Sequence, residues 1–105
     1  MIYITGDTHG SPARLGTEAM PFSTRWTKQD TLIVCGDFGY LFSGGSREEL
    51  TLRELSFRPY TILFVDGNHE NFDMLAAYPP VRWRGGSARR IRRNIYHLMR
   101  GQVFE

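Results

Sequence analysis

Three short apolar runs, each ending in a glycine-containing loop, constrain the fold of this 105-residue chain more than any other feature. The runs span residues 2–4, 31–35 and 60–65, and they are rich in β-branched and aromatic side chains, which is typical of strands. Helix signals separate the runs, so the order of elements predicts βαβ units with right-handed crossovers. The sequence therefore predicts an α/β fold built on a mostly parallel sheet.

Helix start signals lie between and after the expected strands. Ser11 and Pro12 predict an N-cap followed by a first-turn proline. The sequence SREE at 46–49 fits a capping box in which the serine caps the helix. A third helix is expected to begin at Asn71 and to end before the proline pair at 79–80. Together with the strands, these helices give the alternating order on which the fold prediction depends.

The pattern changes after that proline pair, where short segments are separated by turn residues. Residues 81–91 predict two short strands around a glycine pair. Residues 95–99 and 102–105 predict an antiparallel β-hairpin, whose second arm has no closing turn. We therefore expect residues 1–105 to form part of a larger domain, cut within a strand.

Composition and charge bound the class of protein. The chain is 41% hydrophobic and has a formal net charge of +2, as expected of one small folded domain. The apolar run at 60–65 is far shorter than the roughly 20 residues of a membrane span, and the N-terminus lacks the pattern of a secretory signal. Cys35 is the single cysteine, and its apolar run favours a buried thiol in a reducing compartment. We expect a cytoplasmic protein without a membrane segment.

Arginine supplies nearly all of the positive charge, and much of it lies late in the chain. The late arginines are Arg82, Arg84, Arg89, Arg90, Arg92, Arg93 and Arg100. Such a cluster is typical of a nucleic-acid or phosphate surface, but arginines around short strands also line a solvated face. We favour the solvated face. The alternative is that segment 82–93 binds nucleic acid or another anionic partner, in which case its affinity falls steeply with salt.

Polar residues follow each of the three expected strands. The loops read GDTHG at 6–10, GDFG at 36–39 and GNHE at 67–70, and their spacing of 30 and 31 positions is about one βαβ unit. The carboxyl ends of neighbouring parallel strands face one crevice, so the polar side chains of the loops are expected to converge there. These side chains are Asp7, His9, Asp37, Asn68 and His69.

The chemistry of these side chains predicts a metal site. Carboxylate, imidazole and amide oxygen suit divalent manganese, iron or zinc, and a central carboxylate such as Asp37 can bridge two ions. A two-metal site polarises a phosphoryl group and activates water near neutral pH, while His69 can protonate the leaving oxygen. Each motif alone is weak, because Gly-Asp and Gly-Asn are ordinary turn pairs. The occurrence of all three motifs after three consecutive strands favours one shared metal site over three ordinary turns.

The order and spacing of the motifs resemble those of the calcineurin-like metallophosphoesterases. The family's Asp-x-His, Gly-Asp and Gly-Asn-His-Asp/Glu motifs match at 7–9, 36–37 and 67–70. The resemblance implies the N-terminal half of a four-layered α/β/β/α sandwich. It also implies a phosphoesterase that hydrolyses phosphomonoesters or phosphodiesters of unknown identity through a metal-activated hydroxide. Its implied site residues are Asp7 and His9 on the first ion, Asp37 bridging both, Asn68 on the second, and His69 as acid or phosphate contact.

Two departures from the family pattern matter. Tyr40 stands where the middle motif has a second acidic residue, and Leu41 stands where phosphoprotein phosphatases have a phosphate-binding arginine, which argues against a specialised protein Ser/Thr phosphatase. The family's later histidine motifs are missing, which removes three expected metal ligands. His97 lies in an expected strand, where we favour a packing role over metal binding.

These departures leave two hypotheses. In the first, a C-terminal half or another chain supplies the missing ligands and covers the apolar face of the sheet, or the chain self-associates through that face. In the second, the chain is a catalytically inactive remnant or an anion-binding module.

Overall fold

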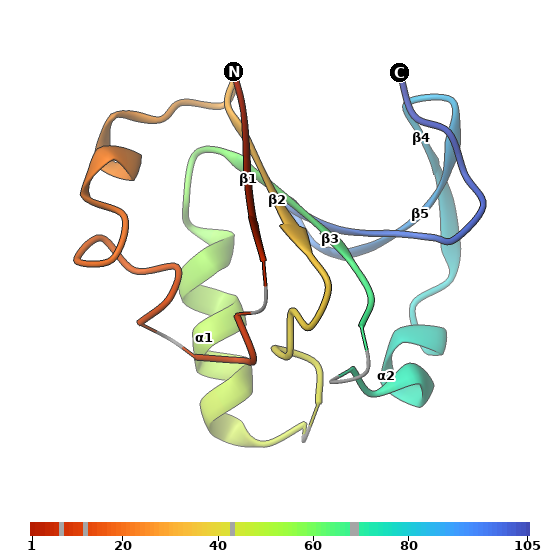
Figure 1. Cartoon of the computed structure of the whole chain (residues 1–105). Helices are drawn as coiled ribbons and strands as arrows, with labels where there is room; N and C mark the ends of the chain where they lie inside the picture. The colour runs from red at the N-terminus through yellow and green to blue at the C-terminus, as the bar shows by residue number, and fades with distance from the viewer. Residues whose placement is uncertain (7, 12, 43, 68–69) are drawn as a thin grey trace.

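The computed structural model describes residues 1–6, 8–11, 13–42, 44–67 and 70–105, which form an α/β fold around one sheet (Figure 1). Within these residues the sheet has six strands in the order β1-β2-β3-β6-β5-β4. The strands are β1 (Ile2–Gly6), β2 (Thr31–Cys35), β3 (Thr61–Val65), β4 (Pro80–Trp83), β5 (Gly86–Arg92) and β6 (Ile95–Leu98). Strands β1, β2, β3 and β6 pair in parallel, whereas β4–β5 and β5–β6 pair antiparallel. The predicted α/β class, with a mostly parallel sheet and a β-hairpin, is confirmed.

One face of the sheet is covered by helical segments. These are η1 (Pro21–Arg25), a 3-10 helix, and the α-helices α1 (Ser46–Ser56) and α2 (Phe72–Ala76). Apolar side chains from the strands, α1, α2 and the residue after η1 form the core between the layers, including Trp26, Val34, Leu52, Leu55, Ile62, Phe64 and Leu75. Burial of these side chains sets the pairing register of the parallel strands. A slip of one residue would turn the buried side chains of a strand to the opposite face of the sheet.

The opposite face of the sheet is apolar and is exposed along β1, although Leu63 of β3 on the same face is buried. Ile2 and Ile4 of β1 are 66% and 70% exposed, and Val65 of β3 is 38% exposed. Cys35 is also exposed, so the prediction of a buried thiol was wrong. Side chains alternate between the faces of a strand, and Cys35 falls at the end of β2 on the face opposite the buried Val34.

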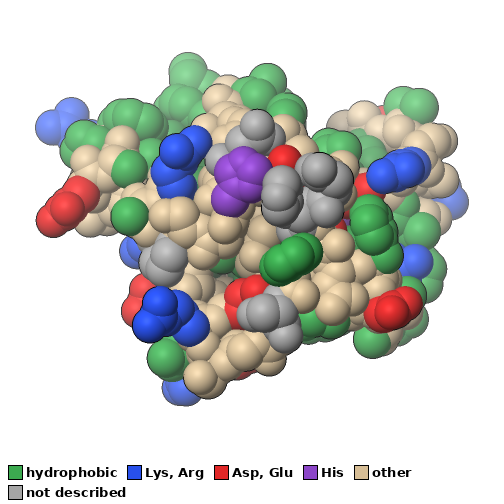
Figure 2. Space-filling model, turned by 60° about the horizontal axis from the view of Figure 1, so that its bottom comes forward, with side chains coloured by type: hydrophobic (Ala, Val, Ile, Leu, Met, Phe, Trp, Pro, Cys, Tyr) green, Lys and Arg blue, Asp and Glu red, His purple; other side chains and the backbone are tan. Residues whose placement is uncertain are grey.

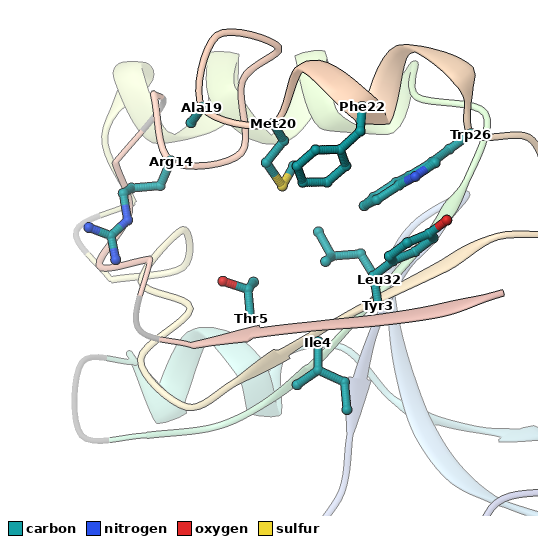
Figure 3. A pocket seen from close by; sticks show the side chains of 9 residues that line it. All are labelled: Tyr3, Ile4, Thr5, Arg14, Ala19, Met20, Phe22, Trp26 and Leu32. Atoms are coloured by element: carbon teal, nitrogen blue, oxygen red, sulfur yellow. The ribbon is translucent and has the colours of Figure 1, made fainter.

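The α-helix expected from Ser11 does not form in the described residues that follow it. Residues 13–19 form turns instead, and η1 is the next helical segment. A helix from Ser11 could not continue through Pro21, which lacks an amide hydrogen and whose ring would clash with the carbonyl four residues earlier, and Gly16 further weakens a helix here. The segment packs on β1, where the rings of Tyr3 and Trp26 stack with centroids 4.1 Å apart (Figure 3).

The two α-helices begin within one residue of the predicted starts, and their caps differ. The side chain of Asn71 caps α2 by accepting a hydrogen bond from the amide of Met74 at 3.1 Å. The predicted capping box of α1 is wrong, because Gly45 is its N-cap and no side chain among the described residues caps it by a hydrogen bond. The Glu48 carboxylate instead accepts hydrogen bonds from the amides of Phe42 and Gly44, both at 2.9 Å.

Of the two predicted C-terminal strand pairs, β4–β5 is confirmed and the hairpin of 95–99 with 102–105 is wrong. Strand β6 lies between β3 and β5, so neighbours already occupy both of its edges. Residues 102–105 lie instead beside the β4–β5 turn, where the amide of Glu105 donates to the carbonyl of Arg84 at 2.9 Å. As to membranes, none of the helices within the described ranges is long and apolar enough to cross one.

Candidate functional site

Hydrogen bonds join the loops that follow β1 and β2. The amide of His9 donates to the carbonyl of Asp37 at 2.8 Å, and the amide of Gly10 donates to the carbonyl of Phe38 at 2.9 Å. The hydroxyl of the buried Thr8 donates to the same Phe38 carbonyl at 2.7 Å. Two predicted metal ligands, His9 and Asp37, are thereby held on neighbouring loops at the carboxyl ends of their strands.

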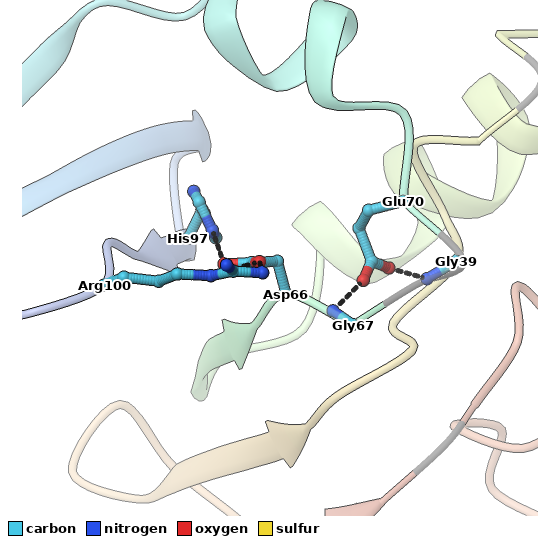
Figure 4. A network of polar contacts seen from close by, with 6 residues as sticks. All are labelled: Gly39, Asp66, Gly67, Glu70, His97 and Arg100. Atoms are coloured by element: carbon cyan, nitrogen blue, oxygen red, sulfur yellow. Dashed lines mark hydrogen bonds and ion pairs between the residues drawn. The ribbon is translucent and has the colours of Figure 1, made fainter.

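A buried carboxylate ties the loop after β3 to the loop after β2. Glu70 is 4% exposed, and its two oxygens accept hydrogen bonds from the amides of Gly39 and Gly67, both at 2.5 Å (Figure 4). Gly67 also lies directly against Asp37, since a Cβ added to Gly67 would overlap the Asp37 carboxylate. The loops after β1, β2 and β3 therefore form one cross-linked cluster.

The backbone of this cluster is unusual at the two described ligands. His9 and Asp37 have φ values of 49° and 47°, in the left-handed region that few residues other than glycine occupy. The first two loops cross at Gly10 and Gly39, where φ is 71° and 77°. A Cβ on Gly39 would lie 2.5 Å from the amide nitrogen of Gly10, so the crossing requires glycine. Strained backbone of this kind concentrates at functional sites.

The structure places two of the five predicted site residues. His9 is exposed and Asp37 is half-buried, and Figure 2 shows histidine and acidic side chains at this end of the molecule. Asp7, Asn68 and His69 lie outside the described residues. Within the described ranges, no three His, Cys, Asp or Glu side chains form a metal-binding group. An imidazole and a carboxylate on adjoining loops are donors that manganese, iron and zinc accept, so the described residues fit such an ion.

Tyr40 explains how the chain tolerates its departure from the middle motif. Its side chain is fully buried, and its hydroxyl donates a hydrogen bond to the carbonyl of Ser11. Its ring packs edge-on against Phe38, with centroids 4.6 Å apart. Burial raises the pKa of Tyr40 to about 12. A neutral phenol thus links the first and second loops where the family pattern has a carboxylate.

Replacing Tyr40 by phenylalanine is expected to cost about 1 kcal/mol of stability at pH 7, the usual net value of one hydrogen bond. The pKa of Tyr40 is higher in the folded chain than its ordinary value of 10.0. Its contribution is therefore fully present below pH 10 and is lost as the pH rises from 10 towards about 12. Urea unfolding at several alkaline pH values should show a shallower decline for Tyr40→Phe than for the wild type. Tyr96→Phe, at a half-buried position, is the control, and equal slopes in all three proteins would contradict the assignment.

The structure also reveals polar residues whose roles the sequence did not predict. Asp66 accepts a hydrogen bond from Arg100 and pairs with His97, whose Nε2 lies 2.9 Å from the carboxylate (Figure 4). Burial acts to raise the pKa of Asp66, but these two partners prevail and lower it. The His97 ring is 6% exposed and stacks on Phe64, as its predicted packing role requires. Only Glu70 had a signal in the sequence, because the third motif ends in an acidic residue.

The late arginines make many contacts within the fold. Arg92 binds both carboxylate oxygens of Glu49 at 2.6 and 2.8 Å, and Arg93 donates to the carbonyl of Ser56 at 2.6 Å. Arg89 donates to the carbonyl of Tyr78. These contacts give the segment a structural role, and binding of nucleic acid or another anionic partner by residues 82–93 stays the untested alternative.

The fold and the site together define a class: α/β proteins whose functional loops follow the carboxyl ends of parallel strands. The sequence model of the family described as calcineurin-like phosphoesterase matches residues 1–102. The chain therefore belongs to the calcineurin-like phosphoesterase family, as the motifs predicted. No curated protein and no solved structure gave a significant match.

Proposed function

We propose that the chain carries part of the dinuclear metal site of a phosphoesterase that hydrolyses phosphomonoesters or phosphodiesters. Family membership supports a metal-dependent phosphoesterase. The observation that carries the proposal is the cross-linking of the three strand-end loops, with His9 bonded to the Asp37 loop and Gly67 packed on the Asp37 carboxylate. Asp7 and His9 would hold one ion and Asn68 the other, with Asp37 between them. Manganese, iron and zinc suit these ligands.

The chain's own residues have distinct parts in this proposal. When bound, divalent ions supply Lewis-acid polarisation of the phosphoryl group and an activated water. The Glu70 carboxylate holds the second and third loops together through the amides of Gly39 and Gly67. His69 donates a proton to the leaving oxygen, a role for which an imidazole is suited near neutral pH.

Two further inferences concern the source of the remaining metal ligands and the cellular compartment of the protein. Because the family's later histidine motifs are missing from residues 1–105, we infer that the remaining ligands come from outside this segment. Cytoplasmic location is part of the same proposal. It rests on Cys35 being the single cysteine of residues 1–105, so that no disulfide can form within this segment.

Hydrolysis of p-nitrophenyl phosphate and bis(p-nitrophenyl) phosphate tests the proposed function. The longest natural form of the chain, stripped of metal by a chelator, is expected to recover activity with Mn²⁺ and to lose it in Asp37→Asn. Asp30→Asn is the matched control, because Asp30 precedes the opposite end of β2 and pairs with the N-terminal amine at 3.1 Å. Activity that survives Asp37→Asn, or that needs no metal, would show the proposal to be wrong.

A further inference from the structure

A pocket lined by charged and apolar side chains lies near the candidate metal site. It has a volume of about 270 Å³ and is lined by Asp66, Phe72, Arg89, His97, Met99 and Arg100. Asp66 directly precedes Gly67, and Gly67 packs against the Asp37 carboxylate. The pocket and the candidate site are therefore joined by one short stretch of backbone at the carboxyl end of β3.

The guanidinium of Arg100 is held in place at this pocket. Its Nε and one terminal nitrogen donate to the same oxygen of Asp66 at 2.9 and 2.6 Å. The Asp66 side chain is only 3% exposed, and its other oxygen pairs with His97, so the carboxylate is itself fixed. The Arg100 side chain is 75% exposed, and a guanidinium has five N–H donors. Donors that do not bind Asp66 are thus available to a ligand.

A second guanidinium gives the pocket an excess of positive charge. Arg89 is half-buried, and one of its terminal nitrogens donates to the carbonyl of Tyr78, which anchors it at the pocket. Two arginines therefore share the pocket with a single carboxylate, that of Asp66. Apolar side chains complete the wall, and Arg100 lies over the Phe72 ring at 6.0 Å from its centroid. Arginines held in place by hydrogen bonds bind phosphate-type anions well, because their planar N–H groups form paired, charge-assisted hydrogen bonds with phosphate oxygens.

We propose that this pocket binds a second phosphate group of the substrate, one that is not hydrolysed, through Arg100 and Arg89. Its use in catalysis depends on the proposed phosphoesterase function, but binding of the anion itself needs no metal ion. Two guanidinium groups favour a dianionic phosphate over a singly charged carboxylate. The pocket would therefore favour substrates that carry two phosphate groups over those that carry one.

Phosphate titration of the chelator-treated chain tests the proposal. Inorganic phosphate is added at constant ionic strength while the Nε–Hε signals of the arginines are followed by ¹H–¹⁵N NMR. The signals of Arg100 and Arg89 are expected to shift and saturate, whereas acetate should cause no saturable shift. Arg100→Gln should weaken phosphate binding about tenfold or more. Arg82→Gln is the control: it removes the same charge from an exposed arginine outside the pocket and should leave phosphate binding unchanged.

Three results would overturn the proposal: shifts that do not saturate, equal affinity in all three proteins, and acetate binding as strong as phosphate binding. Circular dichroism checks that each variant is folded, and Arg89→Gln provides the same test if Arg100→Gln fails to fold. No metal takes part in this titration. Its failure therefore leaves the metal proposal standing, and failure of metal binding leaves the phosphate result standing.

Discussion

Gly39→Ala is expected to destabilise the chain by about 3–5 kcal/mol, through backbone strain and a clash with backbone atoms. Gly39 has a φ of 77°, and a Cβ there would lie 2.5 Å from the Gly10 nitrogen and 2.6 Å from the His9 carbonyl carbon. Backbone atoms cannot rotate away as the end of a side chain can, so the two loops must separate. Because the separation moves His9 away from Asp37, metal affinity should fall together with stability.

Gly101→Ala separates the clash from the backbone strain. Gly101 has the same φ of 77°, but nothing lies within 4 Å of the position of an added Cβ. This variant should cost only about 1–2 kcal/mol, the price of a left-handed conformation for a residue with a side chain. Urea unfolding of both variants measures the difference. If Gly39→Ala were no more destabilising than Gly101→Ala, the loop crossing described here would be incorrect.

Glu70→Gln is expected to cost about 2–3 kcal/mol of stability and to weaken metal binding. The carboxylate is buried and accepts from two amides, one on the loop after β2 and one on the loop after β3. A glutamine keeps one acceptor oxygen and places an NH₂ group against the other amide. One of the two amides then has no acceptor, and the link between the loops is weakened.

Glu49→Gln is the matched control for this substitution. The Glu49 side chain is 64% exposed and pairs with Arg92 at 2.6 Å. Exposed ion pairs contribute about 0–1 kcal/mol, so the same chemical change should have little effect here. Chemical unfolding curves give both values. Similar losses for the two variants would mean that Glu70 is not the link between the loops.

The parts of the fold that the sequence predicted correctly depend on local signals. The three parallel strands and the helix capped by Asn71 each follow from a few adjacent residues. The errors arose where neighbours distant in the sequence decide the structure. The hairpin expected at 95–99 failed because β6 is already paired with β3 and β5. In place of the helix expected from Ser11, residues 13–19 form turns that bury Leu15 in the core, a contact that no adjacent residue indicates.

The candidate site could be predicted in outline only. Its residue types and spacing placed His9 and Asp37 after parallel strands, and the structure holds their loops together. The links that hold them were not predictable, because Glu70 contacts Gly39 from 31 positions away. The pairing of Asp66 with His97 across the same sequence distance was missed for the same reason.

Calorimetric titration of the longest natural form of the chain, stripped of metal, with Mn²⁺ tests the central claim most directly, because it needs no substrate. The cross-linked loops predict saturable binding to the wild type, weakened about tenfold or more by Asp37→Asn, since even changes to groups around a ligand cost that much. Asp30→Asn should bind as the wild type does. No saturable binding, or an isotherm that Asp37→Asn leaves unchanged, would contradict a metal site at these loops.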